Sequence, residues 1–321
     1  MGETDERRKE VAVLSIGAVI VAAGNSSGTG GFQPVMKMGS ISIARRVVST
    51  LHQAGIRRIV VVTGQDAEAL EHDLANLGLV FLHNDRYACT GVLSSVQIGL
   101  SYLKDKCARV FLVPVDAPLF TAGTVRTLMA SRGSVVSPVY HGHTGHPMLV
   151  DSTVIDAFLS DPEDGDWSDT VSRVASRMTV VPVEDAGILY DAETEDDYSK
   201  LLDTHNRQLV RQSIRVSLTR EFPFFDEKTS MLLSLVDETA SVREACSQMK
   251  ISYSTGWNIV RTLESQLHCP LLERIQGGVG GGESRLTEKG RKLVDDYNRY
   301  VRQLSADATE MFEEYFGEDL Q

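Results

Sequence analysis

A glycine-rich segment at residues 22–34, AAGNSSGTGGFQP, follows an apolar run and has the composition of a phosphate-binding loop. Glycine tolerates positive φ and lets a ligand approach the backbone closely, so the amides of such a turn can hold phosphate oxygens at the start of a helix. The segment contains neither Lys nor Arg, the side chains that would neutralise a polyphosphate and stabilise the charge that develops in phosphate chemistry. The residues therefore predict phosphate binding and leave open whether phosphate chemistry follows.

Carboxylates that could hold a divalent cation occur at two later points. Asp116 ends the apolar segment 108–116, ARVFLVPVD, and the pair Asp191 and Glu193 lies in an acidic cluster. Carboxylate oxygens are ligands that Mg2+ prefers. Asp116 could instead cap the turn that follows it, and the acidic cluster could be the solvated start of a helix, where acids favour the positive end of the dipole. His146, which precedes a proline, is either part of a site or an ordinary loop residue.

Alternating strand and helix signals surround these residues and would position them. Apolar runs predict strands, and apolar residues at helical spacing predict helices. Strands are expected at residues 11–23, 57–64, 79–84 and 108–116, with helices at 41–54, 66–78 and 91–105. This alternation favours an α/β fold with a Rossmann-like, mainly parallel sheet. Ligands collect at the carboxyl ends of such strands, so the glycine-rich segment, Asn84 and Asp116 are expected along one rim.

From about residue 203 the pattern becomes mostly helical. A half-exposed strand is expected at 213–221, SIRVSLTRE, because apolar residues alternate with polar ones there. After it, a helix is expected at 226–236, a second helix begins at the capping box of Ser241 and Glu244, and a third is expected at 253–267. A glycine-rich hairpin at 274–285 and a long helix at 287–316 follow. This order is typical of a winged helix-turn-helix domain.

Charge and composition restrict the partners. The chain carries a net charge of -12, whereas Lys and Arg slightly outnumber Asp and Glu over residues 208–306, so a nucleic-acid contact is expected there rather than along the whole chain. The four cysteines show neither zinc-ligand spacing nor a disulfide pattern, and the apolar run near the N-terminus is too short to span a bilayer. We therefore expect a cytoplasmic protein with no membrane partner. The long last helix is amphipathic, which predicts a homodimer.

Five segments follow one another in a familiar order: AAGNSSGTGGFQPVMKMG, NDRYACTGVLSSVQIGL, VPVDAPLF, GHTGHPMLV and AGILYDAETEDDY. In order and approximate spacing they resemble the motifs of the MobA-like nucleotidyltransferase family that makes molybdenum-cofactor dinucleotides, especially its cytidylyltransferase branch. The resemblance implies a domain at residues 14–205 that binds a nucleoside triphosphate (CTP or GTP) with Mg2+, and a molybdopterin-type acceptor. It implies nucleotide contacts at Ala22, Ala23, Gly24, Ser26, Ser94 and Ser95, metal contacts at Asp116, Asp191 and Glu193, and an acceptor-side loop at Gly145, His146 and Pro147.

The glycine-rich segment departs from the family's pattern at two positions. The family has an arginine where this chain has Gly28 and a lysine where it has Gln33. Losing one strong charge-stabilising donor commonly costs about 100-fold in rate or more. Lys37 is the nearest substitute, but it lies four residues beyond Gln33. The simpler interpretation is a retained fold that binds nucleotide or cofactor with weakened or lost catalysis.

The segment ISYSTGWNIVRTLESQLHCPLLERIQGGVGGGESRLTEKG closely resembles the DNA-binding domain of ModE-type regulators, which is LysR-like. The resemblance implies a winged helix-turn-helix domain at residues 210–321, with a C-terminal dimerisation helix and double-stranded operator DNA as its partner. The expected DNA contacts are Ser252, Tyr253, Ser254, Asn258, Arg261, Arg274 and Arg285. Trp257 is expected mainly in the core.

Two functions are compatible with this pair of domains. One is a transcription regulator whose N-terminal domain senses a nucleotide or a cofactor-related ligand. The other is an active Mg2+-dependent molybdenum cofactor cytidylyltransferase with an autoregulatory DNA-binding module. Transfer to a sugar or another small alcohol would use the same fold.

Overall fold

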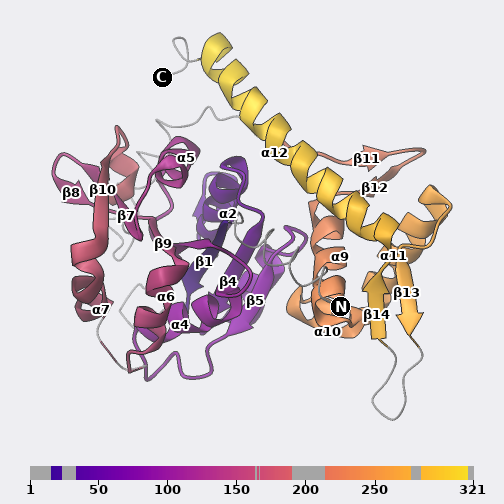
Figure 1. The fold of residues 1–321 in the computed structure, drawn as a ribbon, viewed down its shortest axis with the longest axis horizontal. Coiled ribbons are helices and arrows are strands. Elements are labelled where there is room, and N and C mark those ends of the chain that lie inside the picture. The colour runs from indigo at the N-terminus through magenta and orange to yellow at the C-terminus, as the bar shows by residue number, and fades with distance from the viewer. Residues whose placement is uncertain are drawn as a thin grey trace. The chain divides into compact units, whose positions relative to one another are not determined.

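The computed structural model describes residues 16–23, 34–162, 165, 167–189, 214–275 and 283–316, without the side chains of residues 168, 175, 274, 275 and 313. The chain divides into two compact units, one of residues 1–73 and 82–211 and one of residues 74–81 and 212–321. In the described residues, the first contains a central sheet flanked by helices, and the second contains a group of helices, small hairpins and a long last helix (Figure 1).

The sheet of the first unit has the strand order β10-β7-β9-β6-β1-β4-β5, with β8 added to β7. Its strands are β1 (Ile16–Ala22), β4 (Arg58–Thr63), β5 (Val80–His83), β6 (Arg109–Pro114), β7 (Val135–Tyr140), β8 (His143–Thr144), β9 (Met148–Asp151) and β10 (Met178–Pro182). The strand β1 pairs in parallel with both β4 and β6, and β10 pairs in parallel with β7, whereas β9 runs antiparallel to β6 and β7. The predicted α/β fold with a mainly parallel sheet is therefore confirmed.

The central strands are continuous apolar runs, as parallel strands covered on both faces must be. Helices of the first unit are α2 (Ile43–Gln53), α3 (Ala67–Asp73), α4 (Val92–Leu103), α5 (Ala122–Ala130), α6 (Ser152–Leu159) and α7 (Trp167–Val174), with short 3-10 turns η1 (Ala175–Arg177) and η2 (Ala186–Leu189). Helix α4 packs on β1, β4, β6 and α6, while α2 packs on α5, which packs on β7. Gly99 of α4 permits its close approach, since a Cβ there would lie 2.4 Å from a Val19 methyl group.

Most predicted elements of this unit occur with small shifts in their ends. The segment 41–54 begins with a two-residue strand, β3 (Ile41–Ser42), which forms a hairpin with β2 (Lys37–Met38) before α2 starts. Ser42 caps α2 by accepting a hydrogen bond from the amide of Arg45 at 3.1 Å. Helix α3 ends at Asp73, five residues before the predicted end at 78.

The second unit follows the predicted helix-turn-helix order. Its elements are β11 (Leu218–Thr219), β12 (Pro223–Phe225), α9 (Glu227–Thr239), α10 (Val242–Gln248), α11 (Tyr253–Leu267), β13 (Leu272–Ile275), β14 (Glu283–Leu286) and α12 (Glu288–Phe316). Helix α10 packs on both α9 and α11, and β13 pairs antiparallel with β14 to form the base of the wing. The tip of the predicted wing, 276–282, lies outside the described residues.

The strand predicted at 213–221 is mostly wrong. Of the described residues in this range, only Leu218 and Thr219 form a strand, although the predicted alternation of half-buried and exposed residues is present from 214 to 218. Its partner β12 has three residues and begins with Pro223, which has no amide to donate, and the register shifts between Leu218 and Thr219. The alternation therefore reflects packing beside α12 more than sheet pairing.

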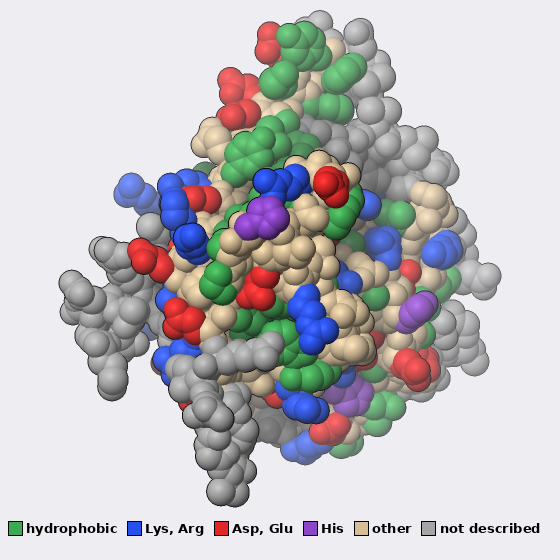
Figure 2. Space-filling model, turned by 90° about the vertical axis from the view of Figure 1, so that its right-hand side faces the viewer, with side chains coloured by type: hydrophobic (Ala, Val, Ile, Leu, Met, Phe, Trp, Pro, Cys, Tyr) green, Lys and Arg blue, Asp and Glu red, His purple; other side chains and the backbone are tan. Residues whose placement is uncertain are grey.

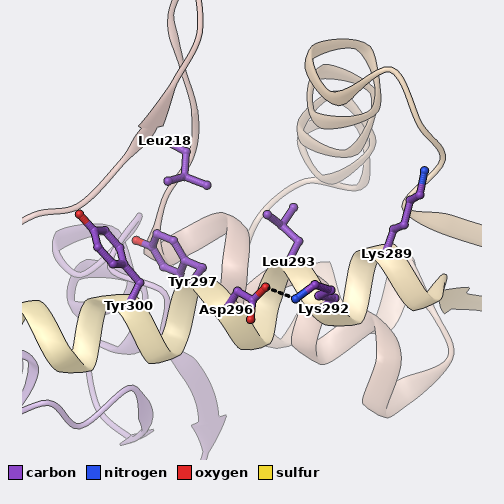
Figure 3. Close-up of a pocket in the computed structure, with 7 residues that line it drawn as sticks. All are labelled: Leu218, Lys289, Lys292, Leu293, Asp296, Tyr297 and Tyr300. Carbon is purple, nitrogen blue, oxygen red and sulfur yellow. Dashed lines mark hydrogen bonds and ion pairs between the residues drawn. The ribbon is translucent and has the colours of Figure 1, made fainter.

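Helix α12 packs its first half against its own unit. Val294, Tyr297 and Val301 are buried, and the Tyr297 hydroxyl donates to the carbonyl of Val216 at 2.8 Å. Beside Leu218, the helix lines an open groove of about 390 Å³, with the Lys292 and Asp296 pair at its edge (Figure 3). No helix in the described part of the chain has the length and apolarity required to cross a membrane.

Candidate functional site

The strand β1 delivers the glycine-rich segment to the carboxyl end of the sheet. Ala22 ends β1, and both Ala22 and Ala23 are buried. A Cβ on Gly64, directly after β4, would lie 3.0 Å from the Ala23 Cα and 2.8 Å from the Tyr87 Cβ. Gly64 therefore brings the start of the glycine-rich segment against the loop after β5. Gly24, Ser26, Gly28 and Gln33 lie outside the described residues.

Asn84 joins the next strand to α4 through its side chain. Its amide nitrogen donates to the Ser95 hydroxyl at 2.9 Å and to the Ser94 hydroxyl at 3.4 Å, and its side-chain oxygen accepts from the amide of Arg86 at 2.9 Å. Asn84, Ser94 and Ser95 are all buried. The three side chains fix the loop 84–90 to the start of α4, and nucleotide contact by the two serines stays a prediction.

Asp116 follows β6 at the same rim. The amide of Val115 donates to the carbonyl of Val21 at 3.1 Å, which places Asp116 beside the end of β1. Asp116 is half-buried. No group of three His, Cys, Asp or Glu residues suited to a metal ion occurs in the described ranges, and Asp191 and Glu193 lie outside them. A single carboxylate fits a divalent cation that takes its other ligands from nucleotide phosphates, and metal contact by Asp116 stays a prediction.

The sequence interpretation missed a buried arginine beside this loop. Arg46 of α2 is 1% exposed, and its Nε donates to the carbonyl of Pro118 at 3.0 Å. This hydrogen bond ties the helix after the glycine-rich segment to the loop after Asp116. The available signal was a cation at position 46 between the apolar residues Ile43 and Val47 on the buried side of an amphipathic helix.

The loop predicted to lie on the acceptor side, residues 145–147, packs on the 3-10 turn η2. The amide of His146 donates to the carbonyl of Ile188 at 2.9 Å, and the His146–Pro147 peptide bond is cis. A Cβ on Gly145 would lie 2.2 Å from that same Ile188 carbonyl oxygen, so only glycine fits. The three residues precede β9, whose antiparallel direction returns them to the rim formed by the ends of β1 and β6.

A buried carboxylate that the sequence interpretation also missed fixes η2 in place. Asp185 accepts from the Thr121 amide at 2.8 Å and the Thr124 hydroxyl at 2.5 Å through one oxygen, and from the Gly187 amide at 3.0 Å through the other. Thr121 also caps α5. Asp185 therefore connects the loop after Asp116 to the turn on which the acceptor-side loop rests. Only the tertiary contacts distinguish it from its acidic neighbours in the sequence.

The second unit presents a polar face along α11. Ser252 caps this helix by accepting from the amide of Thr255 at 3.1 Å, and its hydroxyl also contacts the Ser254 hydroxyl at 2.8 Å. Ser254, Asn258 and Arg261 are exposed at spacings of four and three residues, which places them on one helix face. Figure 2 shows Lys and Arg side chains interspersed with Asp and Glu on the face that carries these elements.

Close packing of two helices holds this polar face in position. A Cβ on Gly256 would lie 2.2 Å from the Cys246 sulfur, so α10 and α11 approach closely at this glycine. Burial raises the pKa of the Cys246 thiol. Opposite the polar face, Val260 and Leu263 are fully buried, whereas Trp257 is only half-buried and is less deeply packed than predicted.

The predicted capping box forms only in half. The Ser241 hydroxyl accepts from the amide of Glu244 at 3.2 Å, as predicted. The Ser241 amide donates to the Thr239 hydroxyl at 3.3 Å, while the Glu244 carboxylate accepts from Gln248 at 3.4 Å. Thr239, at the end of α9, therefore supplies the acceptor that the prediction gave to Glu244.

The structure describes the side chain of one wing arginine, Arg285, and only the backbone of the other, Arg274. Arg285 of β14 is exposed, and its guanidinium pairs with the Glu283 carboxylate at 3.0 Å. Arg274 lies opposite Ser284 in the register of β13 and β14, and its side chain lies outside the described atoms. DNA contact by either residue stays a prediction.

Comparisons with known proteins divide the chain in the same way. The MobA-like NTP transferase domain family matches residues 18–178, and the bacterial regulatory helix-turn-helix family of the lysR type matches residues 231–291. A nucleotidyl transferase from Methanothermobacter thermautotroptrophicus is 19% identical, with a TM-score of 0.54 over 61% of this chain and 99% of its own, which supports the fold alone.

Two curated relatives match the C-terminal part. Transcriptional regulator ModE of Haemophilus influenzae is 32% identical over 79 residues, which cover 25% of this chain and 31% of that protein. Molybdenum-pterin-binding protein MopA of Rhodobacter capsulatus is 35% identical over 63 residues, which cover 20% of this chain and 24% of that protein. The chain thus spans a third or less of the length of these relatives. It belongs to the MobA-like NTP transferase domain family and carries a lysR-type helix-turn-helix fused behind that domain.

Proposed function

We propose that this protein is a ModE-type DNA-binding transcription regulator whose N-terminal unit binds a nucleotide or a molybdenum-cofactor-related ligand. The observation that carries the proposal is the exposed face of Ser254, Asn258 and Arg261, which begins at the capped N-terminus of α11. Polar side chains near the N-terminus of a recognition helix read base edges in the major groove. The curated regulators that match this region support the same role.

The ligand of the first unit is inferred from its rim. Backbone amides of the glycine-rich segment would hold the phosphates, and Asp116 would hold a divalent cation, which we propose to be Mg2+. The segment has no cation at Gly28 or Gln33, so binding with little transfer explains the retained rim. The similarity to MopA, a molybdenum-pterin-binding protein, supports a pterin-type ligand as the second candidate.

The proposal also includes the oligomeric state and the location of the protein. Helix α12 exposes Met311, Tyr315 and Phe316 in its last turns, and apolar side chains gather at its C-terminal end at the top of Figure 2. Such a stripe on a long helix is suited to pairing with a second copy, so the regulator would act as a homodimer. Its partner would be double-stranded operator DNA, and its location would be the cytoplasm.

DNA binding is tested first, with double-stranded fragments selected from a random library. Asn258→Ala should weaken binding of the selected site by about 10-fold to 100-fold, because a lost bidentate base contact costs about 1–3 kcal/mol. Ser265→Ala, an exposed change nearer the C-terminus of the same helix and so farther from the residues that meet base edges, is the matched control and should leave specific binding intact. A wild-type protein that enriches no DNA sequence would contradict the proposal.

Ligand binding is tested by thermal unfolding with CTP, GTP or a molybdopterin, each with and without Mg2+. A ligand present at 100 times its Kd stabilises the native state by about 2.7 kcal/mol. Asp116→Ala should remove the part of the triphosphate shift that depends on Mg2+. The proposed sensor role would be wrong if none of these ligands raised the unfolding temperature.

An active cytidylyltransferase is the second candidate, and the placement of Asp116 beside the end of β1 favours it. Release of pyrophosphate from CTP in the presence of Mg2+ and a molybdopterin decides between the two. Release well above that of Asp116→Ala would establish transfer, whereas equal release by both proteins would leave the binding role.

A further inference from the structure

Three side chains from two helices form a stack at the N-terminal end of the proposed recognition helix. Arg243, in the first turn of α10, places its guanidinium carbon 4.9 Å from the centroid of the Tyr253 ring. Tyr253 is the first residue of α11, and its ring meets Trp257 edge-on, at 6.2 Å between centroids and an interplanar angle of 87°. The stack therefore runs from α10 across the helix-turn-helix corner to α11.

The backbone on both sides of this stack is tightly fixed. Ser241 caps α10 two residues before Arg243, and Ser252 caps α11 one residue before Tyr253. Farther along, the close approach of Gly256 to α10 sets the spacing of the two helices. A ring that contacts both a guanidinium and an indole is restricted in orientation, so less side-chain entropy is lost when it meets a ligand.

Two side chains of the stack are open to solvent. Tyr253 is 45% exposed, and Arg243 is exposed as well. A guanidinium that stacks on a ring keeps its five N–H donors in the plane of the stack, where they can still bind a phosphate. In a helix-turn-helix, the first helix crosses the DNA backbone while the N-terminal residues of the second helix meet base edges. Arg243 and Tyr253 occupy these two places.

Resting on the proposed function, we propose that Arg243 binds a DNA phosphate and, through the same stack, presses the Tyr253 ring against one base pair of the operator. The face of a phenol ring is apolar and suits the 5-methyl group of a thymine. Trp257 contacts the ring edge-on and is a positioning residue. The stack thus couples a contact that is independent of sequence to one that selects a base.

The experiment measures Kd for the selected double-stranded site as a function of salt, with two variants at Arg243, Tyr253→Ala and one control variant of the whole chain. Arg243→Gln removes the charge and the stack, whereas Arg243→Lys keeps the charge without the planar group. Arg177→Gln removes an exposed charge from the other unit and is the control. Each variant is also measured on sites in which a single thymine is replaced by uracil, which removes only the methyl group.

We expect Arg243→Gln to lower the magnitude of the slope of log K against log salt by about 0.9 for each bound protomer. Arg243→Lys should keep the slope. For the wild type, one thymine-to-uracil change should weaken binding by about fourfold, the value of one buried methyl group. Both Arg243 variants and Tyr253→Ala should lose this sensitivity, while Arg177→Gln should match the wild type in every measurement.

The outcomes separate this inference from the function on which it rests. A wild-type protein that binds no DNA refutes both. A wild type that binds a selected site, with Arg243→Gln showing the same Kd and salt slope, refutes the phosphate contact alone. Retained sensitivity to the thymine methyl group in Tyr253→Ala refutes the base contact. Circular dichroism of each variant identifies loss of folding, and Arg243→Lys, which keeps the charge, provides the second measurement if Arg243→Gln unfolds.

Discussion

Gly256 allows a quantitative test of the helix-turn-helix packing. A Cβ at this position would lie 2.2 Å from the Cys246 sulfur and 3.7 Å from a Val242 methyl group. The Cys246 side chain is 2% exposed, so the sulfur has no room to move into solvent. Gly256→Ala must therefore push α10 and α11 apart or force the sulfur into a strained rotamer.

Two opposing effects determine the size of the change. Alanine favours a helix over glycine by about 1 kcal/mol, whereas overpacking of a core costs about 1–3 kcal/mol. Gly256→Ala should therefore be neutral to destabilising by about 2 kcal/mol in the wild-type chain. With Cys246→Ala in place, the nearest atom of residue 246 would be its Cβ at 3.9 Å, an ordinary contact. In that background Gly256→Ala should stabilise by about 1 kcal/mol.

The assay is urea unfolding of the full chain in a Trp167→Phe background, which leaves Trp257 as the single tryptophan and thus reports on the second unit. The double-mutant cycle should give a favourable coupling of about 1–3 kcal/mol between the two alanine substitutions. Equal stabilisation by Gly256→Ala with and without the cysteine would mean that the helices are not in close contact at this point. Unchanged unfolding in all three variants would lead to the same conclusion.

Three further predictions concern the first unit and the thiols. Gly64→Ala should abolish any thermal shift with CTP and Mg2+, because the new Cβ would strike Tyr87 and the backbone after β1; an undiminished shift would count against this rim as the ligand site. Asp185→Asn should destabilise the chain by about 1–3 kcal/mol in urea unfolding, because its amide NH2 would face one of the hydrogen-bond donors that Asp185 accepts from. Asp185→Glu keeps the charge and tests whether the length of the side chain matters. An Asn variant as stable as the wild type would contradict the role given to this carboxylate. Iodoacetamide at neutral pH should label exposed Cys89 well before Cys246, because burial both covers the latter thiol and raises its pKa; mass spectrometry of the native protein measures the order, and equal rates would disprove it.

Local signals in the sequence were sufficient for most of the architecture. The apolar runs at β1, β4 and β6 and the helical spacing of α4 and α11 appear where they were expected, because burial on both faces of a sheet or on one face of a helix leaves a periodic pattern. The strand expected at 213–221 failed for a tertiary reason. Its alternation came from packing beside α12, and its partner strand, β12, is too short to extend it.

The site was predictable only in part. Asn84 and Asp116 could be located because strand ends in a parallel sheet share one rim, whereas the loop at 145–147 was indicated only by the family resemblance. Arg46 and Asp185 could not, because their roles depend on carbonyl, hydroxyl and amide groups that lie 61 to 72 residues away in the chain. The sequence does not show which of several acids will meet such donors.

By itself, the sequence determined the two fold types, their order, and the absence of cations at Gly28 and Gln33, since these depend on residue type and local spacing. Only the tertiary structure determined that Asp185 joins the two loops of the rim, that Gly256 sets the spacing of α10 and α11, and that Arg243 stacks on Tyr253. Each of these is a contact between separate elements. Such contacts depend on distances that arise only when the helices and strands pack together.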